Sequence, residues 1–391
     1  MALGRALIVS LLAGAALAAC GTSAAQDVPA EKWTDSSPDA FSDDFSAKLA
    51  ADRGRLWLAV LGANGEDRSL RVKVFARGNG RWESTAGIDA AVSSASPISF
   101  AVPPDQVAED VGAPCLGLTT VSRTSEVRCL NQGSWKAIRL PDAMRRSCQI
   151  VDLYSYRGGL VALTTANEPK KLILQAWKLD TAGWHRLGNP VKAEGGVGLL
   201  GQNSDPNAIP DILLTTFNRV PERRVLSLRD GRWEQPVPPL KGPGMGPTTS
   251  GSVRHGDYVY IPVDVATERN WPLSVFSFTP QQSWRQVGER KVNSGVGSAQ
   301  GGIDYAAGNV WVTWQQNDSS HLKRGLFPTQ IFAQCLTSEE LGEQTLLWKG
   351  LSIGPGSVQI VGAEDQEYAL FMRPSGRDPR GLHATVRPVS C

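Results

Sequence analysis

The chain has four histidines, His185, His255, His321 and His383, which lie far apart in the sequence. Metalloenzymes often place two histidines at the short spacing of HExxH, so that both rings face one ion. Neither HExxH nor HxH occurs here, and the chain has no GxSxG nucleophile elbow and no phosphate-binding glycine loop. We therefore interpret the histidines as surface or loop residues, and we predict no metal and no cofactor.

Neighbouring acidic residues occur in pairs, among them Asp43–Asp44, Glu109–Asp110 and Glu364–Asp365. Glycosidases need two carboxyl groups roughly 5 Å apart for retention or 6.5–9.5 Å apart for inversion. Neighbours in the sequence do not establish that separation, so we interpret these pairs as solvated loop residues. The sequence predicts no catalytic residue, and a binding role is favoured over an enzymatic one.

The first 19 residues have the pattern of an export signal, with Arg5 ahead of the short apolar run "ALIVSLLAGAALA". The run ends in "LAAC", residues 17–20, which resembles the lipobox of bacterial lipoproteins. The resemblance implies that Cys20 is lipidated and becomes the mature N-terminus, with residues 20–30 as a flexible tether. The alternative is an ordinary secretory signal with a chance cysteine. We expect a protein of the bacterial cell envelope, anchored to a membrane at the outer membrane or cell surface.

Five cysteines follow Cys20, and export to an oxidising compartment would allow them to form disulfides. Cys115 and Cys129 flank a plausible hairpin turn at "SRTS" and are our first choice for a bridge; Cys335 with Cys391 is the second. Because the number is odd, at least one cysteine stays unpaired or pairs between chains.

Seven tryptophans share one local setting, directly after a turn in most cases: Trp33, Trp82, Trp135, Trp184, Trp233, Trp284 and Trp348. The intervals between them are 49, 53, 49, 49, 51 and 64 residues, and all but the last lie within two residues of 51. Such regular spacing indicates an internal repeat.

Each repeat carries two short runs rich in β-branched and aromatic residues ahead of its tryptophan, such as "GLVALTT" and "LILQAWKL", and a less regular run before them. These runs predict strands. The nearest candidate for a helix, "DAFSDDFSAKLAA", is weak. Four antiparallel strands repeated at about 50 residues predict an all-β fold, a β-propeller. Each tryptophan would begin an outermost strand and wedge between neighbouring blades.

The two ends of the repeat are incomplete: the last unit lacks an outer strand with tryptophan, and no strand pair precedes Trp33. Both gaps are filled if residues near 30–36 supply the outer strand of the last blade, so that the two termini close the ring. We therefore predict one domain over residues 31–391, with seven four-stranded blades; six blades with an appendage is the alternative. The 64-residue interval would reflect the longer loop "QQNDSSHLKRGLFPT".

The units resemble those of kelch-type and sialidase-like propellers. "RGGLVALTT" with Trp184 is similar to a kelch repeat, and "SLRDGRWE" is similar to the Asp-box of sialidases, although its spacing departs from that pattern. The resemblance implies the fold, but it carries over no catalytic set residue by residue.

The loops between the second and third strands of each unit carry an excess of about five positive charges by our loop boundaries, in a chain of 40 Lys+Arg and 38 Asp+Glu. Arginine favours planar recognition of carboxylates and phosphates, and indoles stack on sugars. The candidate partner-binding face consists of Arg219, Arg223, Arg224, Trp271, Trp314, Lys323, Arg324, Arg377 and Arg380. A solvated rim of mixed charge is the alternative.

The near-neutral chain as a whole argues against nucleic acid as a partner. The sequence therefore predicts a lipid-anchored propeller of the cell envelope that binds a protein or an anionic glycan. The alternatives are an envelope enzyme acting on glycans, of the sialidase-like or lyase kind, and a purely structural scaffold.

Overall fold

A computed structural model provides the structure of the chain, in which Asp35–Cys391 form one compact unit. The structure describes residues 40–391 with gaps at 42, 53, 65–66, 79–80, 93–97, 104–106, 108–111, 121, 123, 146–147, 169–170, 194–195, 217–219, 243–249, 265–272, 291–296, 319–325, 338–339, 353–357, 364 and 375–381.

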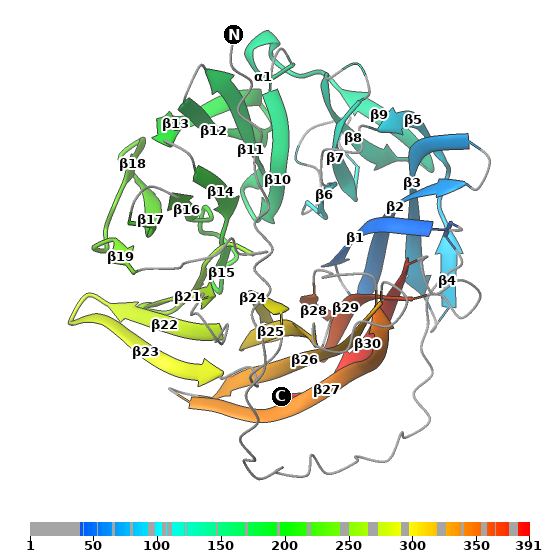
Figure 1. Cartoon of the computed structure of the whole chain (residues 1–391). Helices are drawn as coiled ribbons and strands as arrows, with labels where there is room; N and C mark the ends of the chain where they lie inside the picture. Colours follow the sequence, from blue (N-terminus) through cyan, green and yellow to red (C-terminus); the bar gives the residue numbers. More distant parts are fainter. Residues whose placement is uncertain are drawn as a thin grey trace, which may run out of the picture. The chain divides into compact units, whose positions relative to one another are not determined.

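Antiparallel strands form seven sheets, which we call blades 1 to 7 in chain order (Figure 1). Blade 1 has β1 (Asp43–Asp52), β2 (Arg55–Asn64), β3 (Asp67–Gly78) and β4 (Arg81–Ser84), and β5 (Ile88–Val92) also pairs with β3. Blade 2 has β6 (Ser99–Ala101), β7 (Cys115–Thr119), β8 (Ser125–Asn131) and β9 (Ser134–Ile138). Blade 3 has β10 (Cys148–Tyr156), β11 (Gly159–Glu168), β12 (Lys171–Asp180) and β13 (Gly183–Ala193).

The remaining blades follow the same order. Blade 4 has β14 (Gly196–Leu200), β16 (Ile212–Thr216), β17 (Glu222–Arg229) and β18 (Arg232–Glu234), and β19 (Leu240–Lys241) also pairs with β17. Blade 5 has β20 (Val253–His255), β21 (Tyr258–Asp264), β22 (Leu273–Thr279) and β23 (Gln282–Arg290), and β15 (Gln202–Asn203) pairs in parallel with β20. Blade 6 has β24 (Gly297–Ala306), β25 (Asn309–Asn317), β26 (Phe327–Thr337) and β27 (Glu340–Ser352). Blade 7 has β28 (Gln359–Ala363), β29 (Gln366–Pro374) and β30 (Leu382–Val389).

The prediction of a seven-bladed β-propeller is therefore confirmed, and the six-blade alternative is wrong. Blade 7 contributes three described strands; residues 30–36, predicted to supply its fourth, lie outside the described part of the chain. The described helix is α1 (Asp142–Arg145), a single turn, and the segment that was the nearest helix candidate contains β1 instead. Among the described residues, no helix is long and apolar enough to cross a membrane.

The hydrophobic core lies between the blades, because side chains alternate between the two faces of each strand and each face meets a neighbour. Leu163, Leu174 and Ile212 illustrate one such layer, which joins blades 3 and 4. The layer that contains Leu58 and Val386 joins blade 1 to blade 7, so the last described blade packs against the first. Burial on both faces explains why the middle strands of each blade read as nearly continuous apolar runs.

Five tryptophans of the repeat occupy equivalent places, as the second or third residue of an outer strand: Trp82, Trp135, Trp184, Trp233 and Trp284, here called the outer tryptophans. Each packs on the apolar layer shared with the preceding blade, and Trp82 does so across the junction with blade 7. Three indole N–H groups also donate to backbone carbonyls of that preceding blade. Trp135 donates to Ala86 at 2.9 Å, Trp233 to Leu187 at 2.9 Å and Trp284 to Pro238 at 2.6 Å.

Trp348 departs from this pattern. It is the ninth residue of β27 and packs on the layer between blades 6 and 7, which is the following blade. The 64-residue interval therefore has a second cause besides a longer loop, namely that Trp348 sits further along its strand. Trp33 lies outside the described residues.

Two disulfides join cysteines within the described part of the chain. Cys115 and Cys129 face each other across the β7–β8 pair and are joined, and Cys335 of β26 is joined to the C-terminal Cys391. The second bond ties the end of the chain beyond blade 7 to blade 6. The side chain of the fifth cysteine, Cys148, lies outside the described part of the chain.

Candidate central binding cavity

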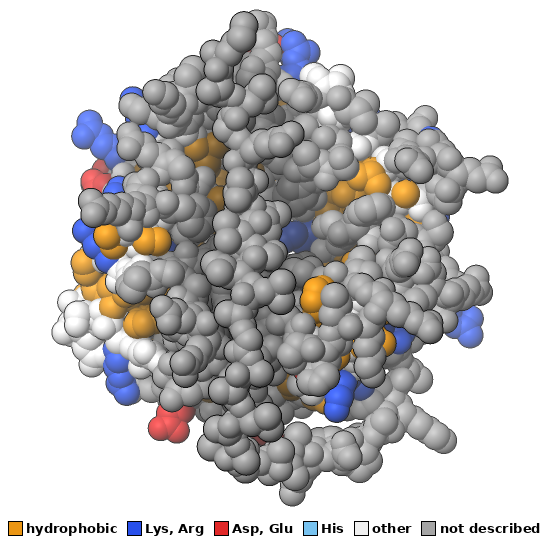
Figure 2. Space-filling view, viewed as in Figure 1, with side chains coloured by type: hydrophobic (Ala, Val, Ile, Leu, Met, Phe, Trp, Pro, Cys, Tyr) orange, Lys and Arg blue, Asp and Glu red, His pale blue; other side chains and the backbone are white. Residues whose placement is uncertain are grey.

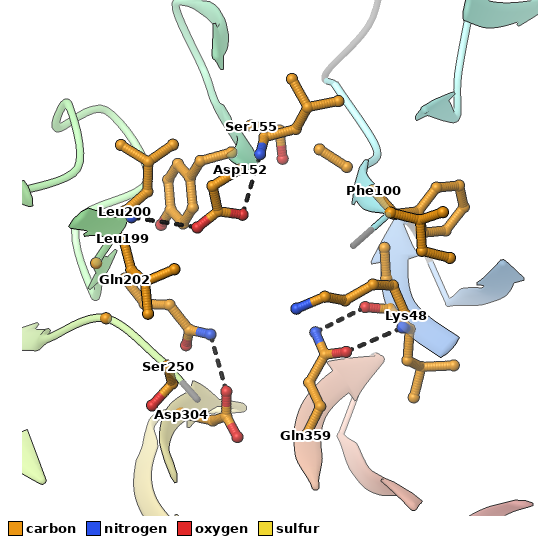
Figure 3. Close-up of a pocket in the computed structure, with 18 of the residues that line it drawn as sticks. Lys48, Phe100, Asp152, Ser155, Leu199, Leu200, Gln202, Ser250, Asp304 and Gln359 are labelled. Atoms are coloured by element: carbon orange, nitrogen blue, oxygen red, sulfur yellow. Dashed lines mark hydrogen bonds between the residues drawn. The ribbon is translucent and has the colours of Figure 1, made fainter. Parts of the chain in front are cut away.

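The inner strands of the blades surround a cavity of about 350 Å³ (Figure 3). Its lining comes from β1, β6, β10, β14, β15, β24 and β28, and from Ser250 and Gly251 just before β20. Part of this wall is apolar, with Phe100, Val197 and Leu199 among its residues. Polar side chains also line it and come from several blades, among them Lys48 of β1, Asp152 of β10, Asp304 of β24 and Gln359 of β28.

Lys48 of β1 extends its side chain into this cavity (Figure 3). Its neighbours Ala47 and Leu49 are buried in the blade, and alternation along the strand turns Lys48 towards the centre. No hydrogen bond or ion pair to Lys48 is found within the described part of the chain. On the face of the molecule that Figure 2 shows, Lys and Arg side chains lie mainly around the rim, and one basic side chain is visible at the centre.

Asp152 of β10 reaches from blade 3 to blade 4. Its carboxylate accepts hydrogen bonds from the backbone N–H of Leu153 at 3.0 Å and of Leu200 at 3.1 Å. Burial raises the pKa of this carboxyl, and the nearby Lys48 ammonium and the two N–H donors only partly oppose that shift.

Asp304 of β24 is a second buried carboxyl in the cavity wall. It accepts hydrogen bonds from the backbone N–H of Ile360 at 2.9 Å and from the side-chain amide of Gln202 at 3.1 Å. Its exposed fraction is 3%, and burial raises its pKa to about 7 against the opposing effects of these donors and of Lys48. Near neutral pH, Asp304 is therefore divided between its neutral and charged forms.

Two further side chains also accept a hydrogen bond from the backbone of the next blade. The hydroxyl of Ser250 accepts a hydrogen bond from the N–H of Ile303 at 2.6 Å. Gln359 of β28 accepts from the N–H of Leu49 at 3.0 Å and donates to the carbonyl of Leu49 at 2.9 Å (Figure 3). In all four cases a residue at the inner edge of one blade binds the backbone of the next blade's innermost strand, and we call these contacts the inner bridges.

The inner bridges have a physical cause. The innermost strand of a blade has one edge without a neighbouring strand, and its buried N–H groups need acceptors. The side chains of Asp152, Ser250, Asp304 and Gln359 supply acceptors across four junctions: blades 3 to 4, 5 to 6, 6 to 7 and 7 to 1. These groups therefore have a structural role, and Lys48 is left as a cation directed into the void.

Two residues of the candidate partner-binding face are not on a surface. Arg223 of β17 is fully buried, and Trp314 of β25 is 2% exposed and stacks on Phe332 with ring centroids 5.2 Å apart. Placing them at a binding face was wrong, because both belong to strands and their side chains turn into the layers between blades. Arg224 is partly exposed, but its guanidinium donates to the carboxylate of Glu222, which offsets its charge.

The other predicted site residues lie outside the described part of the chain: Cys20, Arg219, Trp271, Lys323, Arg324, Arg377 and Arg380. The structure therefore brings no pair of the predicted partner-binding residues together in a described site. Asp44, interpreted as a solvated loop residue, is 1% exposed in β1 and accepts a hydrogen bond from the N–H of Ala384. Across the described residues, no cluster of three or more His, Cys, Asp or Glu could hold a metal ion.

Sequence reasoning missed Lys48, Asp152, Asp304 and Gln359. A signal for them does exist, since each is a single polar residue inside the first, short apolar run of its repeat, as in "SAKLAA" and "QIVDLY". A strand buried on both faces is expected to be an almost continuous apolar run, and the single polar residue interrupts that run. It marks the strand that lines the centre, where a polar side chain finds neighbouring backbone or solvent.

Comparison with known proteins supports the fold. No family model matches the chain, and no curated protein sequence matches it. A puromycin-hydrolysing peptidase of Mycobacterium tuberculosis is similar in structure, with a TM-score of 0.51 and 11% identity over 88% of this chain and 51% of that one. The β-propeller domain of the Trilobed protease from Pyrococcus furiosus has a TM-score of 0.47 and 11% identity over 88% of this chain and 93% of that domain.

A sialidase of Trypanosoma rangeli matches more distantly, with a TM-score of 0.40 and 13% identity over 89% of this chain and 55% of that one. At these identities the likeness extends to the fold alone, and this chain spans only about half the length of the peptidase and of the sialidase. Fold and site together define the class of protein: a seven-bladed β-propeller with a central cavity of mixed polarity.

Proposed function

We propose that this protein is a non-enzymatic, lipid-anchored β-propeller of the bacterial cell envelope that binds a protein or an anionic glycan. One observation carries the choice of binding over catalysis: the carboxylates of the central cavity already accept hydrogen bonds from the walls that they join. An enzyme needs acid and base groups that meet on a substrate, whereas here Asp152 and Asp304 hold neighbouring blades together. The envelope location rests on the lipobox-like "LAAC" motif.

A second candidate is an envelope glycan-active enzyme of the hydrolase or lyase kind. Asp304, with its pKa raised to about 7, faces the same cavity as Asp152 and Lys48, and a carboxyl poised near neutral pH suits general acid catalysis. We rank this candidate second because both carboxylates already accept hydrogen bonds that join neighbouring blades.

Affinity capture on the full chain, immobilised in mild detergent, tests both candidates. Solubilised envelope proteins and purified cell-wall polysaccharide are passed over it at low and high salt, and bound protein and bound sugar are both measured. Retention of one protein, or of a glycan that elutes with salt, supports the binding proposal. Retention of neither contradicts it.

Incubation of the retained glycan with the protein then separates binding from catalysis. The binding proposal predicts that the glycan is recovered at its original chain length. Shortening of the glycan that is lost in Asp304→Asn, with the variant's unfolding curve still cooperative, would instead establish the enzymatic candidate.

A further inference from the structure

We propose that the central cavity binds a small organic monoanion, such as a carboxylate with a short apolar body, whose anionic group pairs with Lys48. The inference concerns a site at the centre of the propeller, and it stands whether or not an envelope partner binds elsewhere. It rests on three features of the cavity: its free cation, its occupied carboxylates and its apolar wall.

Lys48 supplies the attraction for an anion. Lys48 is half-buried and lines the cavity, its ammonium carries three N–H donors, and no described residue accepts from it. The Lys48 ammonium acts through space to lower the pKa of Asp152 and Asp304, but neither carboxylate forms an ion pair with it among the described residues. A carboxylate or phosphate oxygen at this position would form a charge-assisted hydrogen bond in a partly water-excluded site.

The two carboxylates leave this position open. Asp152 is held by Leu153 and Leu200, and Asp304 by Ile360 and Gln202, so both are drawn into the wall and away from the ammonium (Figure 3). Because burial favours the neutral form of both carboxyls, the cavity carries less negative charge than a count of its residues suggests.

The apolar wall selects an organic ligand. Val197 of β14 is 44% exposed, one of four large hydrophobic side chains among the described residues that are 39% or more exposed, and it lines the cavity with Leu199 and Phe100. A volume of about 350 Å³ is near the lower end of the range for ligand pockets. These dimensions suit a ligand of one anionic group and a small apolar body.

Titration calorimetry on the full chain in mild detergent tests the inference directly. The probes are hexanoate and benzoate, their uncharged amides hexanamide and benzamide, and inorganic phosphate. We expect each carboxylate to bind roughly tenfold or more tightly than its amide, the effect of one charge-assisted contact. Equal binding of acid and amide, stronger binding of phosphate than of hexanoate, or no binding of either carboxylate would overturn the proposal.

Substitutions locate the site. Lys48→Met is expected to weaken hexanoate binding roughly tenfold or more, and Lys48→Arg to retain most of it. Lys136→Met removes an exposed lysine of β9 on an outer strand and serves as the matched control, with unchanged binding expected. Val197→Asp keeps Lys48 and adds a negative charge at an exposed position, so it should also weaken binding. Wild-type affinity in both Lys48→Met and Val197→Asp would place the ligand elsewhere.

The pH dependence gives an independent measurement. Asp304 shares the cavity wall with Lys48 of β1, with Asp152 and Tyr154 of β10 and with the neutral Gln202 and Gln359, and Lys48 and Gln202 act on its carboxyl directly. A bound anion is repelled by ionised Asp304, so hexanoate affinity should fall between pH 6 and pH 8. Asp304→Asn should flatten this fall; an unchanged slope in that variant would contradict the assignment of the cavity.

Discussion

The rim and the centre of this propeller join the same blades by different chemistry. At the rim, outer tryptophans lie on the preceding blade and three of them donate indole N–H groups to its backbone. At the centre, the inner bridges place small polar side chains against the backbone of the following blade. The rim therefore gains stability mainly from buried apolar area, and the centre from satisfying N–H groups that no strand can reach.

This difference is a consequence of geometry. Strands diverge towards the rim, so a large ring is needed to fill the wedge between two sheets. Towards the centre the strands converge, and a bulky side chain would close the cavity. Short acceptors such as Asp152 and Ser250 reach the next strand without filling the space that Lys48 enters.

The largest effect is expected from Trp233→Ala at the rim. Trp233 is almost fully buried between blades 3 and 4, and its indole N–H donates to Leu187. Removing it should lower the free energy of unfolding by about 3–5 kcal/mol, the usual range for truncating a buried aromatic residue. Urea denaturation measures the change. A loss below about 1 kcal/mol would mean that the outer tryptophans do not stabilise the junctions.

Stability at the centre should depend on pH through Asp304. Its folded pKa of about 7 lies above the ordinary 3.8, so the folded state holds its proton over a range in which the unfolded chain has lost it. Stability is therefore full below about pH 4, falls as pH rises from about 4 to about 7, and stays low above that. The fall is at most about 4 kcal/mol, because each tenfold change in proton binding is worth ~1.4 kcal/mol.

Denaturation curves between pH 4 and pH 8 measure this slope. Asp304→Asn should reduce it, and Asp152 should supply part of the remainder, since burial raises its pKa as well. Stability that rises steadily from pH 4 to pH 7 in the wild type, and equally in Asp304→Asn, would contradict the assignment.

The inner bridge between blades 7 and 1 is expected to have an intermediate effect. Gln359 makes two hydrogen bonds to the backbone of Leu49. Gln359→Ala leaves the N–H and the C=O group of this buried residue without these partners. The expected loss is about 2 kcal/mol, from two hydrogen bonds of ordinary strength. Gln344→Ala, at an exposed position of the outer strand β27, is the matched control and should change stability little. Equal losses in the two variants would show that this bridge does not stabilise the closure.

The smallest effect separates packing from hydrogen bonding at the rim. Trp284→Phe keeps an aromatic ring next to Phe278 but removes the N–H that donates to Pro238. A loss of about 1 kcal/mol is expected by urea denaturation, the net value of one hydrogen bond. Trp348→Phe is the comparison, because no indole hydrogen bond from Trp348 is found in the described part of the structure. A loss as large as that of Trp233→Ala would mean that the hydrogen bond outweighs the packing.

The sequence by itself determined the repeat, the strands and the blade number. Those features depend on local properties: β-branched runs, turn residues, and a tryptophan such as Trp135 or Trp184 at nearly the same place in each unit. They can be predicted from a single sequence because every blade packs against its neighbours in the same way, so the same residue types recur about 50 residues apart.

Only the tertiary structure decided which side chains meet at the centre. Lys48, Asp152 and Asp304 are far apart in the sequence and on different blades, and they come together because the innermost strands converge around one cavity. The sequence analysis placed Arg223 and Trp314 on a binding face, but in the structure both side chains are buried in the layers between blades. Residue type indicates what a side chain can do, but its direction depends on the register of its strand and on the neighbouring blade, which local patterns do not encode.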